Sequence, residues 1–277
     1  MIGLVTDSSS QLPVDLRTRF GVQVVPLTIV VDGEDRVEGV DLTDDEFYAR
    51  LAAGAVVSTA APSPGRVLAA YEAAASAGAT EILSIHIGSN TSATLNSVNV
   101  VSAQSPVPVT VIDTGTASFP VSCCVWAAGL VVERGGTISE AAAAAHAVAE
   151  SVDNVFVVGA LDLARRGGRL ASGADQGDGV PVLALHGGTM DVVERVYDTD
   201  AAIDAMAGYL RDRAGGRAQR AGVGHAGAPE IADGLAAALT ALADVTVVVR
   251  YTVGPSVGAH TGLGTAGCVF FPDDLTR

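Results

Sequence analysis

The segment Glu81–Ser97, EILSIHIGSNTSATLNS, most constrains how this chain can fold. Its first part, Ile82–Ile87, has the length and branching of a buried strand. Gly88 ends the run, four small polar residues follow, and helix-tolerant residues begin at Ala93. The first turn of a helix has unpaired N–H groups and a partial positive charge, so this order of segments is typical of an anion cradle. An ordinary helix cap is the alternative interpretation.

Strand-like and helix-like segments alternate through residues 1–150. This alternation predicts a parallel sheet with helices on both faces and ligands beyond the carboxyl ends of its strands. Four polar clusters each follow a predicted strand: Asp7–Ser10, Ser58–Thr59, Ser89–Ser92 and Asp113–Ser118. We therefore expect the four clusters to meet at one edge of one sheet.

The predicted fold class is α/β with two domains. Residues 1–152 are expected to form a mostly parallel sheet flanked by helices, and residues 153–277 a mixed sheet with helices. Val22–Val31 is predicted as one strand-like run. A hairpin is predicted around His186–Thr189, and Gly254–Gly264 is predicted as a glycine-rich loop before the last strand.

The charge balance argues against two classes of partner. The chain has 31 acidic residues against 16 Lys and Arg, a formal charge of −15, so nucleic acid and a stable membrane association are poor matches. The chain has no basic leader and no apolar stretch of the roughly 20 residues that cross a bilayer. Three cysteines form no even disulfide framework. These features predict a cytoplasmic protein with reduced cysteines.

Catalytic and metal motifs are weak in this chain. The five His and three Cys show no metal-ligand spacing, so we expect no metal and no cofactor. Ser256 lies in Gly254–Gly258, a G-x-S-x-G match, which leaves a serine esterase as an alternative function. Against it, His260 precedes the only later acids, Asp273 and Asp274, whereas an esterase needs the acid first. A G-x-G-x-x-G match at Gly262–Gly267 lacks the helix that a dinucleotide site requires.

Five separated segments together resemble the DegV family of bacterial fatty-acid-binding proteins, over nearly the whole chain. They are Val5–Ser10, Ser58–Pro64 (similar to T-T-S-Q-P-S-P), Ser92–Ser97 (similar to S-G-T-Y-Q-S), Gly167–Leu170 (similar to G-G-R-I) and Gly254–Gly264 (similar to G-P-V-I-G-T-H-T-G-P-G).

The resemblance implies a carrier that buries one long-chain fatty acid in a tunnel at the junction of two α/β domains. Its carboxylate would be bound by Thr59 and Ser92, and His260 and Arg169 would belong to a supporting network, together with Asn90 and Thr261. A separate ATP-dependent fatty acid kinase would convert the presented carboxylate to an acyl phosphate. The carrier itself would contribute no catalytic residue.

This sequence departs from the family pattern close to the predicted carboxylate site. Ala60 and Ala61 replace Ser and Gln, Leu95 replaces an aromatic residue, and Asn90-Thr91 replaces a Gly-Leu pair. A ligand-sensing or scaffold protein without a kinase partner is a third hypothesis.

Overall fold

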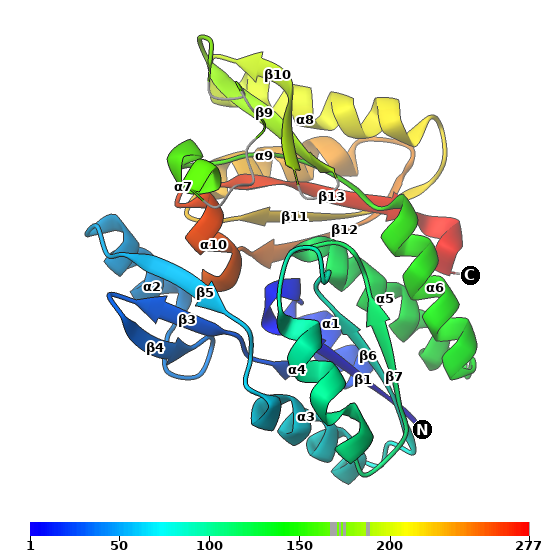
Figure 1. The fold of residues 1–277 in the computed structure, drawn as a ribbon. Helices are drawn as coiled ribbons and strands as arrows, with labels where there is room; N and C mark the ends of the chain where they lie inside the picture. The colour runs from blue at the N-terminus through cyan, green and yellow to red at the C-terminus, as the bar shows by residue number, and fades with distance from the viewer. Residues whose placement is uncertain (167–170, 172, 174–175, 187–188, 277) are drawn as a thin grey trace. The chain divides into compact units, whose positions relative to one another are not determined.

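The computed structural model describes residues 1–166, 171, 173, 176–186 and 189–276. They form two compact units (Figure 1). The first comprises Met1–Glu150 with Leu275 and Thr276, and the second comprises Ser151–Asp274. The last described residues thus belong to the first unit, whereas the sequence interpretation assigned the whole C-terminus to the second domain.

The first unit contains a four-stranded parallel sheet in the order β2-β1-β6-β7. Its strands are β1 (Ile2–Asp7), β2 (Gln23–Val25), β6 (Glu81–His86) and β7 (Val109–Asp113). The α-helices of the unit are α1 (Val14–Phe20), α2 (Asp44–Ala52), α3 (Pro64–Ser76), α4 (Thr94–Val101), α5 (Phe119–Glu133) and α6 (Ile138–Ser151). The α/β fold class with a parallel sheet is confirmed.

A second, antiparallel sheet in the order β4-β3-β5 was not predicted. It comprises β3 (Thr28–Val31), β4 (Glu34–Val37) and β5 (Val57–Ala60). The single strand predicted over Val22–Val31 is wrong, because the run is two strands separated at Pro26, which has no N–H to donate to a sheet.

One apolar core lies on the face of the parallel sheet that α3 and α4 cover. Val5 and Ile82 of the sheet pack there with Tyr71 of α3 and with Leu95 and Val98 of α4. Strand residues alternate between faces. Ser84 pairs with Val5, and Ile82, Ser84 and His86 share this face, so two polar side chains lie beside the core.

The second unit has a six-stranded mixed sheet in the order β10-β9-β8-β13-β11-β12, in which only β11 and β12 are parallel neighbours. Its strands are β8 (Asp153–Val157), β9 (Val180–His186), β10 (Thr189–Val196), β11 (Gln219–His225), β12 (Val245–Thr252) and β13 (Ala266–Pro272). Its helices are α7 (Leu161–Arg166), α8 (Thr199–Ala214), α9 (Pro229–Thr240) and α10 (Pro255–Thr261). β9 and β10 pair as predicted, and their turn lies outside the described residues.

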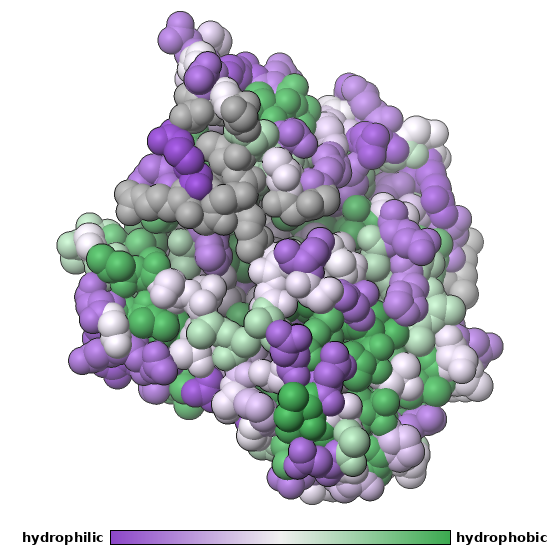
Figure 2. Space-filling model, in the orientation of Figure 1, coloured by the Kyte–Doolittle hydropathy of each residue, from purple (hydrophilic) through white to green (hydrophobic). Residues whose placement is uncertain are grey.

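The surface is mixed in character. The structure exposes large apolar side chains such as Val40, Val56 and Val100, and the face drawn in Figure 2 accordingly shows hydrophobic residues interspersed with hydrophilic ones. Within the described part of the chain, no helix has the length and apolar character needed to span a bilayer. Cys123, Cys124 and Cys268 are all buried and free.

Candidate functional site

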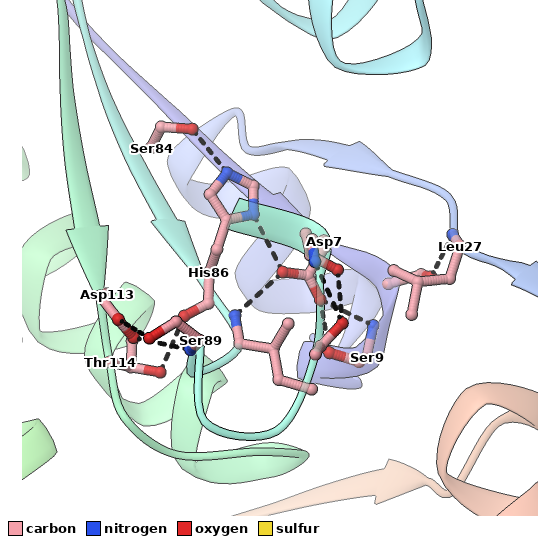
Figure 3. Close-up of polar contacts among 12 residues, drawn as sticks. Asp7, Ser9, Leu27, Ser84, His86, Ser89, Asp113 and Thr114 are labelled. Carbon is pink, nitrogen blue, oxygen red and sulfur yellow. Dashed lines mark hydrogen bonds and ion pairs between the residues drawn. The ribbon is translucent and has the colours of Figure 1, made fainter. Parts of the chain in front are cut away.

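Three of the four predicted polar clusters meet at the carboxyl edge of the parallel sheet. They follow β1, β6 and β7, and Figure 3 shows Asp7, His86, Ser89 and Asp113 in this region. The fourth cluster does not follow a strand of this sheet. Ser58 and Thr59 lie within β5 of the antiparallel sheet, so the predicted convergence is confirmed for three clusters and wrong for the fourth.

A chain of buried polar side chains lies beneath this edge. His86 Nδ1 lies 2.9 Å from Asp7 Oδ2, and His86 Nε2 lies 2.7 Å from the hydroxyl of Ser84. Tyr71 OH lies 3.0 Å from the same Ser84 hydroxyl. With Nδ1 donating to Asp7, Nε2 accepts from Ser84, and Ser84 accepts from Tyr71. Burial raises the pKa of Tyr71, against a smaller opposing effect of the Ser84 hydrogen bond.

Asp7 also fixes two backbone segments. Its Oδ2 accepts a hydrogen bond from Ile87 N at 3.0 Å, and its Oδ1 accepts from Ser9 N at 3.2 Å and from the Ser9 hydroxyl. One buried carboxylate therefore ties the end of β1 to the end of β6, where the polar loop before α4 begins. We name residues 87–93 the β6–α4 loop.

Asp113, the last residue of β7, holds the same loop from the other side. Its carboxylate accepts from Ser89 N at 3.1 Å, from Ser89 Oγ at 2.5 Å and from Gly115 N at 3.0 Å. Partial desolvation of the exposed Asp113 side chain acts to raise its pKa, but these hydrogen bonds outweigh it and hold the pKa below its usual value.

Ser92, a predicted carboxylate ligand, lies half-buried just before α4. Its N–H donates to Gly88 O at 3.0 Å, and its hydroxyl accepts from Thr94 N at 3.2 Å and lies 2.9 Å from Thr94 Oγ1. The N-cap residue of α4 is Ala93, and the Ser92 hydroxyl accepts from the first N–H of the helix, an end where N–H groups favour an anion.

The other candidates of the first unit lie at different depths. Thr59, the second predicted carboxylate ligand, is half-buried in β5 and pairs with Ile29 of β3. Asn90 is exposed, donates from Nδ2 to Gly115 O at 3.4 Å and accepts from the Thr91 hydroxyl at 3.0 Å.

His260 and Thr261 belong to the second unit and form the last turn of α10. The predicted loop over Gly254–Gly264 is wrong here, because Pro255 occupies the first helical position, where its missing N–H costs nothing. Thr261 O accepts from Ala160 N at 3.1 Å, which ties the end of α10 to the start of α7. A Cβ at Gly159 would lie 1.3 Å from Leu263 O, so only glycine permits this approach.

Arg169, the remaining candidate, lies outside the described residues. Ser256, the alternative nucleophile, is 6% exposed in the first turn of α10, and its φ is not positive. It therefore lacks the strained, exposed geometry of an esterase elbow.

Among the described residues, no three His, Cys, Asp or Glu side chains are grouped as potential metal ligands.

The sequence interpretation missed His86, Ser84 and the individual role of Asp113. A signal was present, because Ser84 and His86 are polar residues two apart in an otherwise apolar strand. Such residues share one buried face and need partners. Asp7, the partner of His86, is 79 positions away, so only the fold brings the two together.

Comparison with known proteins places the chain in a family. Residues 1–273 match the sequence model described as "Uncharacterised protein, DegV family". A DegV domain-containing protein of Streptomyces coelicolor is 35% identical over 97% of both chains, and one of Mycobacterium tuberculosis is 32% identical over 96% of both.

A solved DegV family protein of Thermus thermophilus, described as fatty-acid binding, superimposes with a TM-score of 0.88. It is 30% identical, and the match covers 98% of this chain and 99% of that one. DegV of Bacillus subtilis, described as a fatty acid binding protein, shares the fold at 23% identity and a TM-score of 0.84, covering 98% and 99%. The family match spans nearly all of the sequence, and the chain belongs to the DegV family.

Proposed function

We propose that this protein binds a long-chain fatty acid through its carboxylate and presents that carboxylate to a separate ATP-dependent kinase. The observation that carries the proposal is the similarity, over almost the whole chain, to the Thermus thermophilus protein described as fatty-acid binding. Thr59 and Ser92 bind the carboxylate, and His260, Thr261, Asn90 and Arg169 form the supporting network.

The geometry around Ser92 supports this assignment. Its hydroxyl lies at the first turn of α4, and the β6–α4 loop contains no Lys or Arg, so neutral donors and helix-end N–H groups would hold the anion. Each hydrogen bond to a charged group contributes about 1.5–3 kcal/mol. The acyl chain contributes about 0.8 kcal/mol for each buried CH₂ group, so the chain dominates affinity and the carboxylate fixes orientation.

Substitution of the two hydroxyls tests the proposal. Ser92→Ala and Thr59→Ala are each expected to weaken fatty acid binding roughly tenfold or more, through loss of one hydrogen bond to a carboxylate. Binding is measured by titration with a fluorescent fatty acid, and bound lipid is identified by native mass spectrometry. Ser58→Ala is the matched control, because Ser58 is the exposed neighbour of Thr59 in β5.

The kinase step needs its own measurement. With a fatty acid kinase and ATP, acyl phosphate formation should fall for Ser92→Ala and stay at the wild-type rate for Ser58→Ala. Folded wild-type protein that neither carries nor takes up a fatty acid would refute the binding proposal. Binding without acyl phosphate formation would refute only the presentation to a kinase.

A further inference from the structure

We propose that Asp113 is a positioning residue of the carboxylate site and acts through Ser92. This inference rests on the proposed function. Asp113 is exposed at the end of β7, and its hydrogen bonds reach the loop that carries Ser92.

After its buried first residue, Ile87, the β6–α4 loop is held by hydrogen bonds. Ser89 and Asn90 are exposed, so the middle of the loop has no apolar anchor. At one end, Asp7 accepts from Ile87 N, and Thr114 Oγ1 donates to His86 O at 2.8 Å. Between Gly88 and α4, the Asp113 carboxylate supplies the acceptors for both the N–H and the hydroxyl of Ser89.

The same carboxylate shapes the neighbouring β7–α5 loop. It accepts from Gly115 N, and this turn brings Gly115 against Gly88, where an added Cβ would lie 2.7 Å from the Gly115 backbone. Gly88 N donates to Thr116 O at 2.7 Å across the contact. The Asp113 carboxylate therefore fixes the β6–α4 loop and the β7–α5 loop (residues 114–118) relative to each other.

The hydrogen bonds that fix Gly88 and Ser89 also determine where Ser92 lies. Gly88 O accepts from both Thr91 N, at 2.9 Å, and Ser92 N, at 3.0 Å, so the backbone of Ser92 is fixed to the segment that Asp113 holds. A small displacement of this turn moves the Ser92 hydroxyl away from the position a carboxylate requires. Because hydrogen bonds weaken steeply with poor geometry, such a displacement lowers affinity without removing a ligand group.

Charge alone predicts the opposite effect. A negative side chain near an anion site repels the anion, so neutralising Asp113 would tighten binding if through-space repulsion dominated. The positioning role predicts weaker binding, because Asn replaces the charged Oδ2 acceptor of the Ser89 hydroxyl with an NH₂ donor and leaves only an uncharged oxygen for Ser89 N. The sign of the change in affinity therefore separates the two effects.

The experiment is a double-mutant cycle on the full chain, with palmitic acid and hexadecanol as probes. Asp113→Asn is expected to weaken palmitic acid binding about tenfold in the wild-type background and less than about threefold in Ser92→Ala, because the two residues act together. Hexadecanol binding should change less than about twofold, since it has no carboxylate to orient. Ser89→Ala should give a smaller loss, because the backbone hydrogen bond to Asp113 remains.

Asp35→Asn is the control, an exposed aspartate in β4 that should leave binding unchanged. Unchanged or tighter palmitic acid binding by Asp113→Asn, beside a weakened Ser92→Ala, would overturn the positioning role and leave the proposed function intact. An equal loss for palmitic acid and hexadecanol would also overturn it, because the effect would then be on the whole fold. A wild-type protein that binds neither probe would overturn the proposed function itself.

Discussion

The two units each contain a carboxylate–histidine pair, and the pairs differ mainly in burial. His86 and Asp7 lie 2.9 Å apart with both side chains 0% exposed. His186 and Asp153 lie 3.1 Å apart, with His186 50% exposed and Asp153 8%. The distances are nearly equal, but the free-energy cost of breaking each pair differs. Water can hydrate His186 of the second pair once the contact is lost, whereas it reaches neither His86 nor Asp7.

The partners of the two carboxylates reinforce this difference. Asp7 is held by Ile87 N, Ser9 and His86, all within the first unit's interior. Asp153 accepts from Arg213 Nε at 2.7 Å and from Tyr209 OH at 3.3 Å, and the Arg213 side chain is 58% exposed. Removing a partner should therefore be far more costly at Asp7 than at Asp153.

The largest effect is expected from His86→Ala. The substitution leaves the Asp7 carboxylate and the Ser84 hydroxyl buried without their shared partner, and should lower the free energy of unfolding by about 3–5 kcal/mol. Urea denaturation measures the change, with His146→Ala, an exposed histidine of α6, as the control. A loss below about 1 kcal/mol would mean that burial does not distinguish the two pairs.

An intermediate effect is expected from Asp153→Ala. Loss of the charged hydrogen bonds should lower the free energy of unfolding by about 1.5–3 kcal/mol. Burial, and next the Asp153 charge, raise the pKa of Tyr209 to about 12. Tyr209 therefore favours the folded state below the ordinary tyrosine pKa near 10, and this contribution is lost as the pH rises through about 12.

An alkaline absorbance titration checks the assignment. In Asp153→Ala the Tyr209 hydroxyl should titrate closer to the ordinary tyrosine pKa, and Tyr209→Phe identifies the Tyr209 signal in the wild-type protein. An unchanged titration in Asp153→Ala would show that burial alone sets the Tyr209 pKa.

The smallest effect is expected from His186→Ala. The half-exposed imidazole can be replaced by water at Asp153, whose hydrogen bonds from Arg213 and Tyr209 remain, so the loss should be below about 1 kcal/mol. Urea denaturation alongside His86→Ala gives the direct comparison. A loss as large as that of His86→Ala would contradict the role assigned to solvent.

Local patterns predicted much of the fold and less of the site. The apolar run before Gly88 predicted β6 correctly, because branching, length and a glycine stop all act within one segment. The helix α10 was missed because Gly258 within it and the glycines that flank it favour a loop. The tertiary contacts of Ala160 and Gly159 with this segment come from about 100 residues earlier. The distant partners of Asp7 and Asp113, which are His86 and Ser89, were missed for the same reason: no local pattern contains them.

The hydrogen-bonded series from Tyr71 through Ser84 and His86 to Asp7 has a consequence for how the sequence can change. Each side chain of the series is buried away from water, so replacing any one of them takes a hydrogen-bonding partner from its neighbour. The series joins four residues from three elements: Ser84 and His86 of β6, Tyr71 of α3 and Asp7 of β1. A substitution at one of them therefore changes which residues are tolerated at the others. Homologues should keep all four or have exchanged them together for apolar side chains.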